Sequence, residues 1–139
     1  MVCLGNICRS PLAHGIFEHL TSHKNIAVDS AGTAAYHVGN PPDPRSQEVA
    51  LSHGIDISAQ KARQFTVQDF ERYDHIFVMD RSNYSNVIRL ATQEQHRSKV
   101  ELLIPDTEVP DPYYGGFDGF EKCYQMIFKA CQKPINAFP

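Results

Sequence analysis

The chain has 139 residues, enough for one domain with a hydrophobic core of its own. Hydrophobic residues make up 42% of the sequence and charged residues 21%, proportions that are typical of a globular protein and exclude a disordered one. The net charge of −3 argues against a nucleic-acid partner, and the lack of a secretory leader or of an apolar run of about 18 residues predicts a cytoplasmic protein that binds no membrane.

The first half of the chain predicts a short strand, a loop, two helices and a second strand. Only Met1 and Val2 precede the loop, so the first strand is expected to be truncated. Apolar residues at helical spacing, with Pro11 in the first turn, predict a helix over residues 9–20. The remaining expectations are a strand at 25–30, a turn-rich loop at 36–44 and a helix at 45–53.

The second half continues the alternation of strands and helices. A capping pattern at residues 66–69 predicts a brief helical turn, and the apolar run 75–79 is typical of a strand that is buried on both faces. Asp80 is placed to cap a helix that reaches about Ala91. Further along, we expect a strand at 100–104 and a final helix that is capped at 118–121 and ended by Pro134.

This alternation predicts a single α/β domain over residues 1–139. The expected architecture is a three-layer sandwich, in which a short four-stranded parallel sheet carries helices on both faces. Ligands of such sheets bind at the carboxyl ends of the strands, where loops meet helix amino termini. The loop after the first strand is therefore the first candidate for a functional site.

That loop, Cys3–Arg9, has the composition of an anion-binding loop. Gly5 and Asn6 both tolerate positive φ, which lets successive backbone N–H groups point inward and form a nest for an anion. The helix that follows adds its positive dipole end, and Arg9 adds a fork that holds two phosphoryl oxygens. Such surroundings favour a thiolate at Cys3 and predict covalent attack on a bound phosphoryl group. The alternative is an ordinary tight turn that buries two cysteines.

The wider sequence supports the first interpretation. VCLGNICRSP, residues 2–11, resembles the signature of the low-molecular-weight protein tyrosine phosphatases almost letter for letter. Five further segments follow in family order and extend the resemblance over nearly the whole chain: DSAGT at 29–33, GNPPDPR at 39–45, KAR at 61–63, MDRSN at 79–83 and DPYYG at 111–115. Members usually carry several apolar residues ahead of the signature, where this chain has two.

The resemblance implies a phosphatase that hydrolyses phosphotyrosine and other aryl phosphate monoesters through a phosphocysteine intermediate. Its substrate would be a tyrosine-phosphorylated protein, its loop would also bind phosphate, sulfate or vanadate, and the protein would be a monomer or a weak dimer. It implies no cofactor. The sequence independently argues against a structural metal, because no Cys or His pair has the spacing of a zinc site.

The same resemblance assigns the catalytic roles. Cys3 would be the nucleophile, Arg9 the phosphate clamp, and Asp111 in DPYY the general acid and base. Asp43 and Asp106 are also turn-forming acids before or near a proline. Only the match to DPYY distinguishes Asp111 from them. The other loop residues expected to contact the substrate are Leu4, Gly5, Asn6, Ile7, Cys8 and Ser10.

Four residues are expected to support the loop from behind. Ser10 caps the helix, hydrogen-bonds the sulfur, or does both. Asn6 fixes a left-handed turn, with Ser30 in DSAGT as its partner. The family commonly has a His directly before KAR that links the Asn and the Ser. This chain has Gln60 there, whose amide donates and accepts as an imidazole does, so the link can survive with a different geometry.

Aromatic residues are expected to wall the pocket, since a phenyl ring must be held above the phosphate. Tyr36, Tyr113 and Tyr114 are the candidates, and Tyr114 is equally a possible surface phosphorylation target. Cys8 has two interpretations. It is either a small buried side chain or the partner that captures oxidised Cys3 in a reversible disulfide, which would make the protein redox-sensitive.

Three other functions fit similar scaffolds. An arsenate reductase of this fold needs redox cysteines in the middle of the chain, whereas Cys123 and Cys131 lie in the last predicted helix. A protein arginine phosphatase carries Thr where this loop has Ile7, a bulky side chain that favours a flat ring over a guanidinium. A silent phosphotyrosine-binding module would lack the nucleophile or the acid, and both are present.

Overall fold

The structure, a computed structural model, describes residues 1–138 and contains a four-stranded parallel sheet in the order β2-β1-β3-β4. Val2 pairs with Ala31 on one side and with Val78 on the other, so the short β1 is a central strand. The strands are β1 (Val2–Cys3), β2 (Ala31–Gly32), β3 (Ile76–Val78) and β4 (Val100–Leu102).

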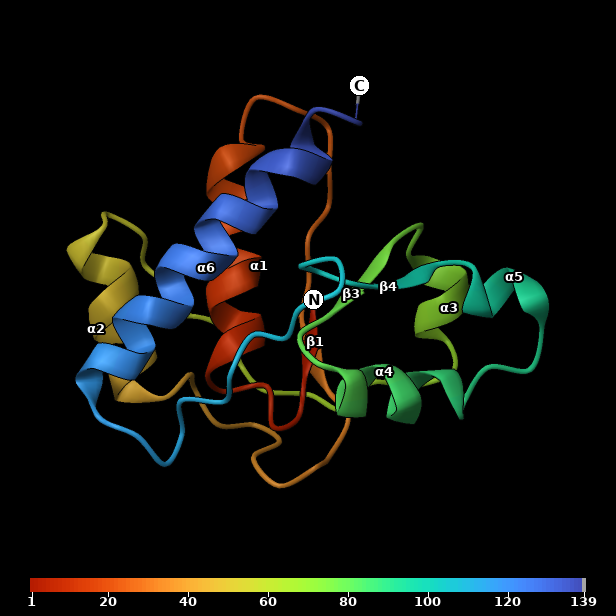
Figure 1. The fold of residues 1–139 in the computed structure, drawn as a ribbon, viewed down its shortest axis with the longest axis horizontal. Helices are drawn as coiled ribbons and strands as arrows, with labels where there is room; N and C mark the ends of the chain where they lie inside the picture. The colour runs from red at the N-terminus through yellow and green to blue at the C-terminus, as the bar shows by residue number, and fades with distance from the viewer. Residues whose placement is uncertain (139) are drawn as a thin grey trace.

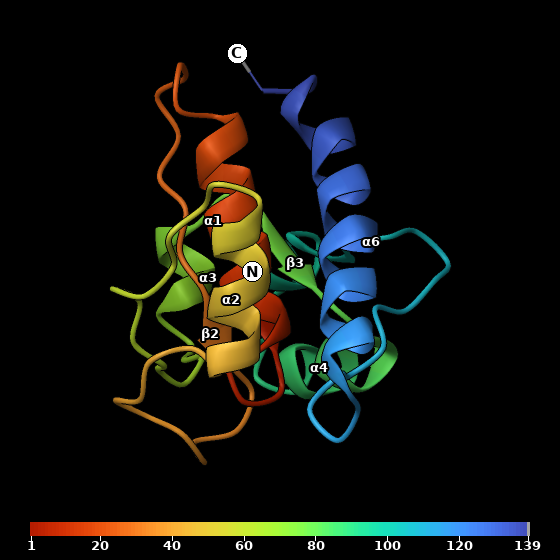
Figure 2. The same ribbon diagram turned by 90° about the vertical axis from the view of Figure 1, so that its left-hand side faces the viewer.

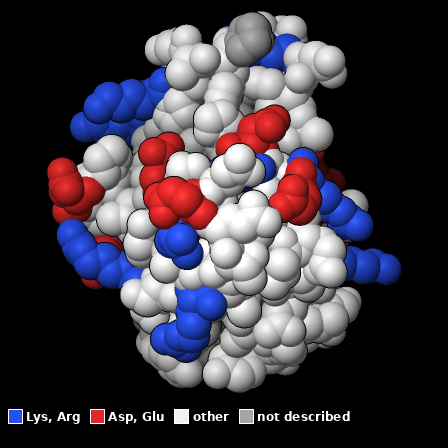
Figure 3. All heavy atoms as spheres, turned by 90° about the vertical axis from the view of Figure 1, so that its right-hand side faces the viewer, with Lys and Arg blue, Asp and Glu red and all other residues white. Residues whose placement is uncertain are grey.

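Helices cover both faces of this sheet, which confirms the predicted three layers (Figures 1 and 2). One layer consists of α1 (Arg9–Leu20), α2 (Pro44–Ser52) and α6 (Phe117–Ile135). The other consists of α3 (Asp69–Arg72), α4 (Arg81–Ile88) and α5 (Glu94–Arg97). On the outer face of this second layer, acidic and basic side chains are interspersed (Figure 3).

Each face of the sheet has its own hydrophobic core. The larger cluster fills the space between the sheet and α1, α2 and α6, and its fully buried side chains include Leu12, Ile16, Val49, Phe120 and Ile127. The smaller cluster lies under α3 and α4 and contains Phe70, Val78 and Val87. Because α1 packs against β1 as well as against α2 and α6, burial of its apolar face fixes where its amino terminus sits.

One predicted strand is not formed, and the predicted end of one helix is wrong. The segment 25–30 is not a strand, because Asp29 Oδ1 accepts a hydrogen bond from the backbone N–H of Ser30 and the adjacent β1 has only two residues to pair with. Pro134 does not end the last helix, which continues to Ile135. A proline this close to the carboxyl end disturbs only the last turn.

Helix α4 begins where the sequence predicts, but it ends at Ile88 rather than near Ala91. Asp80 caps α4 as predicted, since its Oδ1 accepts from the backbone N–H of Asn83 at 2.7 Å. Gly116, rather than Asp118, is the cap residue of α6, and α5 was not predicted. No helix in the described part of the chain is long and apolar enough to cross a membrane.

Ile127→Ala should lower the free energy of unfolding by about 2–5 kcal/mol, because it leaves a cavity where α6 packs on the larger core. The control Lys129→Ala lies on the exposed face of the same helix and should change stability by less than about 0.5 kcal/mol. Chemical denaturation of both variants tests this, and equal losses would contradict the assigned core.

Candidate active site

The loop between β1 and α1 curls around the sulfur of Cys3. Asn6 is in the left-handed conformation with φ 57°, whereas Gly5 is not. A Cβ at Gly5 would lie 3.0 Å from Cδ2 of His37, so the His37 ring would have to shift to accept a side chain there. The left-handed turn at Asn6 directs its backbone N–H to the sulfur at 3.3 Å.

A second hydrogen bond reaches the sulfur from the start of α1. The hydroxyl oxygen of Ser10 lies 3.1 Å from Cys3 Sγ, and both residues are buried. Cys8, not Ser10, occupies the cap position of α1, and no side chain caps that end. The free N–H groups and positive dipole end of α1 are thus left facing the loop, which is the arrangement of an anion site.

Arg9 is the buried cation of this site. Its Nη1 donates to Asp80 Oδ2 at 2.7 Å and to the carbonyl of Val109 at 2.9 Å. Burial alone would lower the pKa of Arg9, but the charges of Cys3 and Asp80 outweigh it and raise the pKa. Sequence analysis treated Asp80 only as a helix cap. Its position at the carboxyl end of β3, the edge that also holds the loop, was the signal for this second role.

Asp111 lies at the mouth of the site, in the segment that leads from β4 to α6. Its Oδ1 accepts from the backbone N–H of Tyr113 at 3.0 Å, and its Oδ2 lies 3.6 Å from Nη2 of Arg9. The two other acids that sequence analysis kept open are placed differently. Asp43 is paired with Arg45 at 2.9 Å, and Asp106 is exposed and does not line the cavity.

Arg45, which sequence analysis did not single out, holds the segment that carries Asp111. From α2 its guanidinium donates to the carbonyl oxygens of Tyr113 at 2.9 Å and Gly115 at 3.0 Å. Asp43 orients that guanidinium through both carboxylate oxygens. Burial raises the pKa of Asp43, but its hydrogen bonds to Arg45 outweigh this and leave the pKa below its usual value.

These residues enclose a cavity of about 90 Å³ with Cys3 and Arg9 among its lining residues. Tyr36 and Tyr114 are 75% and 93% exposed, so they form an outer rim, while Tyr113 is half-buried. The complete lining is Cys3, Leu4, Gly5, Ile7, Cys8, Arg9, Tyr36, His37, Asp111, Tyr113 and Tyr114. His37 is the one lining residue that sequence analysis missed. A larger cavity of about 460 Å³ lies beside Met1 and contains none of them.

Behind the loop, the side-chain amide of Asn6 joins three segments. Its Nδ2 donates to Ser10 at 2.7 Å and to Ser30 at 3.0 Å, and its Oδ1 accepts from the backbone N–H of Arg63 at 3.0 Å. Gln60 does not form the predicted link to Asn6 and Ser30. Its amide instead donates to the carbonyl of Pro11, because the side chain lies against α1.

The other three cysteines differ from Cys3 in their surroundings. Burial raises the pKa of Cys8 far above its usual value, that of Cys123 to about 11 and that of Cys131 to about 12. All four cysteines are free thiols in this structure. Cys3 alone among them accepts a backbone N–H and contacts a serine hydroxyl at the start of a helix.

Comparison with known proteins gives a consistent result. The sequence model of the family described as low molecular weight phosphotyrosine protein phosphatase matches residues 1–138. The human protein of that name is 43% identical, and the match covers 94% of this chain and 89% of the relative.

Solved structures agree with this result. A protein tyrosine phosphatase from Entamoeba histolytica, with Hepes in its active site, superimposes with a TM-score of 0.91 at 36% identity, covering 97% and 92% of the two chains. Wzb from Vibrio vulnificus, in complex with benzylphosphonate, superimposes with a TM-score of 0.90 at 31% identity, covering 99% and 95%.

Gly32→Ala should weaken anion binding by the loop. A Cβ on Gly32 would lie 2.8 Å from the carbonyl oxygen of Leu4 and 3.1 Å from the N of Asn6, both backbone atoms that cannot move without the loop. We expect a loss of about 1–3 kcal/mol in stability and weaker binding of inorganic phosphate, measured by calorimetry. Gly116→Ala, where a Cβ meets open space, is the control. Wild-type affinity in Gly32→Ala would contradict the packing described here.

Proposed function

The chain belongs to the low molecular weight phosphotyrosine protein phosphatases, and we propose that it hydrolyses phosphotyrosine in proteins through a phosphocysteine intermediate on Cys3. The observation that carries this proposal is the buried Cys3 sulfur, which accepts the backbone N–H of Asn6 and lies 3.1 Å from the Ser10 hydroxyl at the start of α1, where Arg9 is also buried. The loop N–H groups, the amino end of α1 and Arg9 would bind a phosphoryl dianion directly in front of this sulfur, in position for nucleophilic attack.

In the first step the Cys3 thiolate attacks phosphorus and forms the S–P bond. The bond between phosphorus and the tyrosine oxygen breaks, and that oxygen takes a proton from the carboxylic acid of Asp111. In the second step the Asp111 carboxylate takes a proton from water, whose oxygen attacks phosphorus. The S–P bond breaks, inorganic phosphate leaves, and the thiolate is restored.

The surrounding groups stabilise the charges in both steps. Arg9 and the inward N–H groups hold the equatorial phosphoryl oxygens, and Asp80 fixes the guanidinium for this task. The Ser10 hydroxyl donates to the sulfur and makes the thiolate a better leaving group in the second step. Arg45 keeps the segment that carries Asp111 over the cavity.

An aromatic substrate is favoured by the walls of the cavity. Ile7 and Tyr113 line it, and Tyr36 and Tyr114 form its rim, so a flat ring would contact apolar surface on leaving the phosphate site. The Vibrio vulnificus relative was solved with benzylphosphonate, a ligand that joins a phosphonate to an aromatic ring. Phosphate, sulfate and vanadate should occupy the same loop.

We further propose a cytoplasmic location, a monomer or weak dimer as the working form, and capture of oxidised Cys3 by Cys8. A reducing compartment suits four free thiols, one of which must remain reactive. Cys8 belongs to the same loop as Cys3, and both residues line the cavity.

Cys3→Ser should abolish turnover of p-nitrophenyl phosphate and still bind inorganic phosphate, because the loop N–H groups and Arg9 remain. Cys123→Ser, whose hydroxyl keeps the hydrogen bond to the carbonyl of Pro110, is the matched control and should stay active. Rapid acid quenching and mass spectrometry should find the phosphoryl group on Cys3 of the wild type. Turnover by Cys3→Ser would remove Cys3 as nucleophile.

Asp111→Asn should lower kcat about 10²–10⁴-fold for phenyl phosphate, whose leaving group needs a proton. The loss should be smaller for p-nitrophenyl phosphate in single-turnover experiments, because its leaving group is stable as an anion. Asp106→Asn, at an exposed acid five residues earlier with φ 62°, is the control. Equal losses with both substrates would argue against Asp111 as the proton donor.

A further inference from the structure

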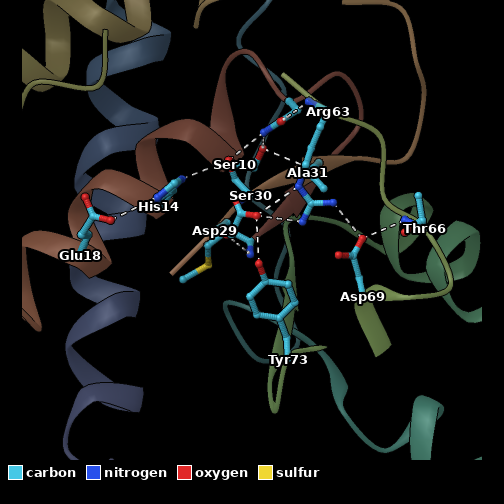
Figure 4. A network of polar contacts seen from close by, with 12 residues as sticks. Ser10, His14, Glu18, Asp29, Ser30, Ala31, Arg63, Thr66, Asp69 and Tyr73 are labelled. Carbon is cyan, nitrogen blue, oxygen red and sulfur yellow. Dashed lines mark hydrogen bonds and ion pairs between the residues drawn. The ribbon is translucent and has the colours of Figure 1, made fainter. Parts of the chain in front are cut away.

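A continuous chain of hydrogen bonds links the sulfur of Cys3 to a histidine on the next turn of α1. Ser10 contacts the sulfur, Asn6 Nδ2 donates to Ser10 and to Ser30, and the Ser30 hydroxyl lies 3.3 Å from Nδ1 of His14. Figure 4 shows His14 between Ser30 and Glu18, whose carboxylate lies 3.4 Å from Nε2 of the ring.

The hydrogen bond from the backbone N–H of Arg63 sets the direction of the hydrogen bonds around Asn6 and Ser30. Asn6 Oδ1 accepts from the backbone of Arg63, so its Nδ2 must be the donor to both serines. Ser30 Oγ therefore accepts from Asn6 and has its own hydrogen left to give. The acceptor within reach of that hydrogen is Nδ1 of His14, which requires the neutral ring with its proton on Nε2, facing Glu18.

The same reasoning applies at the other end of the chain. Ser10 Oγ accepts from Asn6, so its own hydrogen has two acceptors within reach, the Cys3 sulfur at 3.1 Å and the carbonyl of Ala31 at 3.5 Å. The position of the Asn6 amide decides how well Ser10 is aimed at the sulfur. Through Ser30, His14 holds that amide.

We propose that neutral His14 is a positioning residue for Cys3, which accepts the Ser30 hydroxyl proton and thereby holds Asn6 and Ser10 in the orientation that stabilises the thiolate. This inference rests on the proposed function only for its catalytic consequence. Protonated His14 would offer Ser30 a second donor, leave the buried Ser30 hydrogen without an acceptor, and disturb the chain.

The charges around His14 act in opposite directions. Burial lowers the pKa of the ring, and so does the Met1 ammonium directly before β1, whose own pKa burial lowers to about 6. Glu18 on α1 and Asp29 before β2 raise the pKa of the ring, with a net lowering. The folded protein therefore prefers the neutral ring. As pH falls below 6.5, protonation should cost folded-state stability and weaken the support of Cys3.

Three variants test the proposal. His14→Phe keeps a flat ring and removes the acceptor. His14→Asn places an amide oxygen near the position of Nδ1, so it keeps an acceptor without a titrating group. His19→Gln, on the exposed side of the same helix, is the control for the loss of a histidine.

The first measurement is the alkylation rate of Cys3 by iodoacetamide between pH 5 and 8, with the site read by mass spectrometry. In His14→Phe the midpoint of the profile should move up by roughly 0.5–1 pH unit, the worth of about one hydrogen bond to the thiolate. We expect the wild-type profile to show an additional step below pH 6.5, where protonation of His14 changes the alkylation rate of Cys3. His14→Asn should keep the wild-type midpoint and lose this step.

The second measurement is hydrolysis of an aryl phosphate. His14→Phe should lower kcat by about fivefold with little change in KM, because the thiolate becomes a poorer leaving group while the phosphate contacts remain. His14→Asn should restore kcat, and His19→Gln should match the wild type.

A folded His14→Phe variant with the profile and kcat of His19→Gln would overturn the proposal, and so would His14→Asn behaving like His14→Phe. If His14→Phe does not fold, persistence of the step below pH 6.5 in His14→Asn overturns the proposal and its disappearance supports it. A wild-type chain without phosphatase activity would overturn the proposed function alone, since alkylation reports on His14 without turnover.

Discussion

The side-chain amide of Asn6 is the constraint on which the site depends. Asn6 has the left-handed backbone conformation in this loop. Its amide hydrogen-bonds Ser10 at the start of α1, Ser30 directly before β2 and the backbone of Arg63. A loop of backbone N–H groups has no hydrophobic core of its own, so its shape must be imposed by such bonds. Once that shape is fixed, the Cys3 sulfur lies where the amino end of α1 and the inward N–H groups of the loop converge.

Charge balance is the second requirement. Burial of the Arg9 charge without partners would be unfavourable. Asp80 and the Val109 carbonyl, which come from two other segments, compensate by hydrogen-bonding the guanidinium. The Arg9 guanidinium also lies 3.6 Å from Asp111, so the proposed phosphate clamp and the proposed proton donor are adjacent. This arrangement explains why residues far apart in the chain converge on a cavity of only about 90 Å³.

Sequence reasoning found what is local in the chain and missed what depends on tertiary contacts. The loop from Cys3, the helix cap at Asp80 and the parallel α/β order follow from short-range patterns, and they agree with the structure. His14, Arg45 and the second role of Asp80 depend on which segments meet, and no spacing in the sequence reports that. Gln60 was misplaced for the same reason, since its side chain packs on α1.

One feature of α1 links the chemistry to the fold as a whole. Its first turn supplies Arg9 and Ser10 to the cavity, while Leu12 and Ile16 on the same helix are completely buried in the larger core. The part of the site that α1 supplies is therefore anchored in the core and keeps its place only while the domain stays folded. Inactivation by heat should accompany global melting of the protein, so residual activity after heating would serve as a direct count of surviving folded molecules.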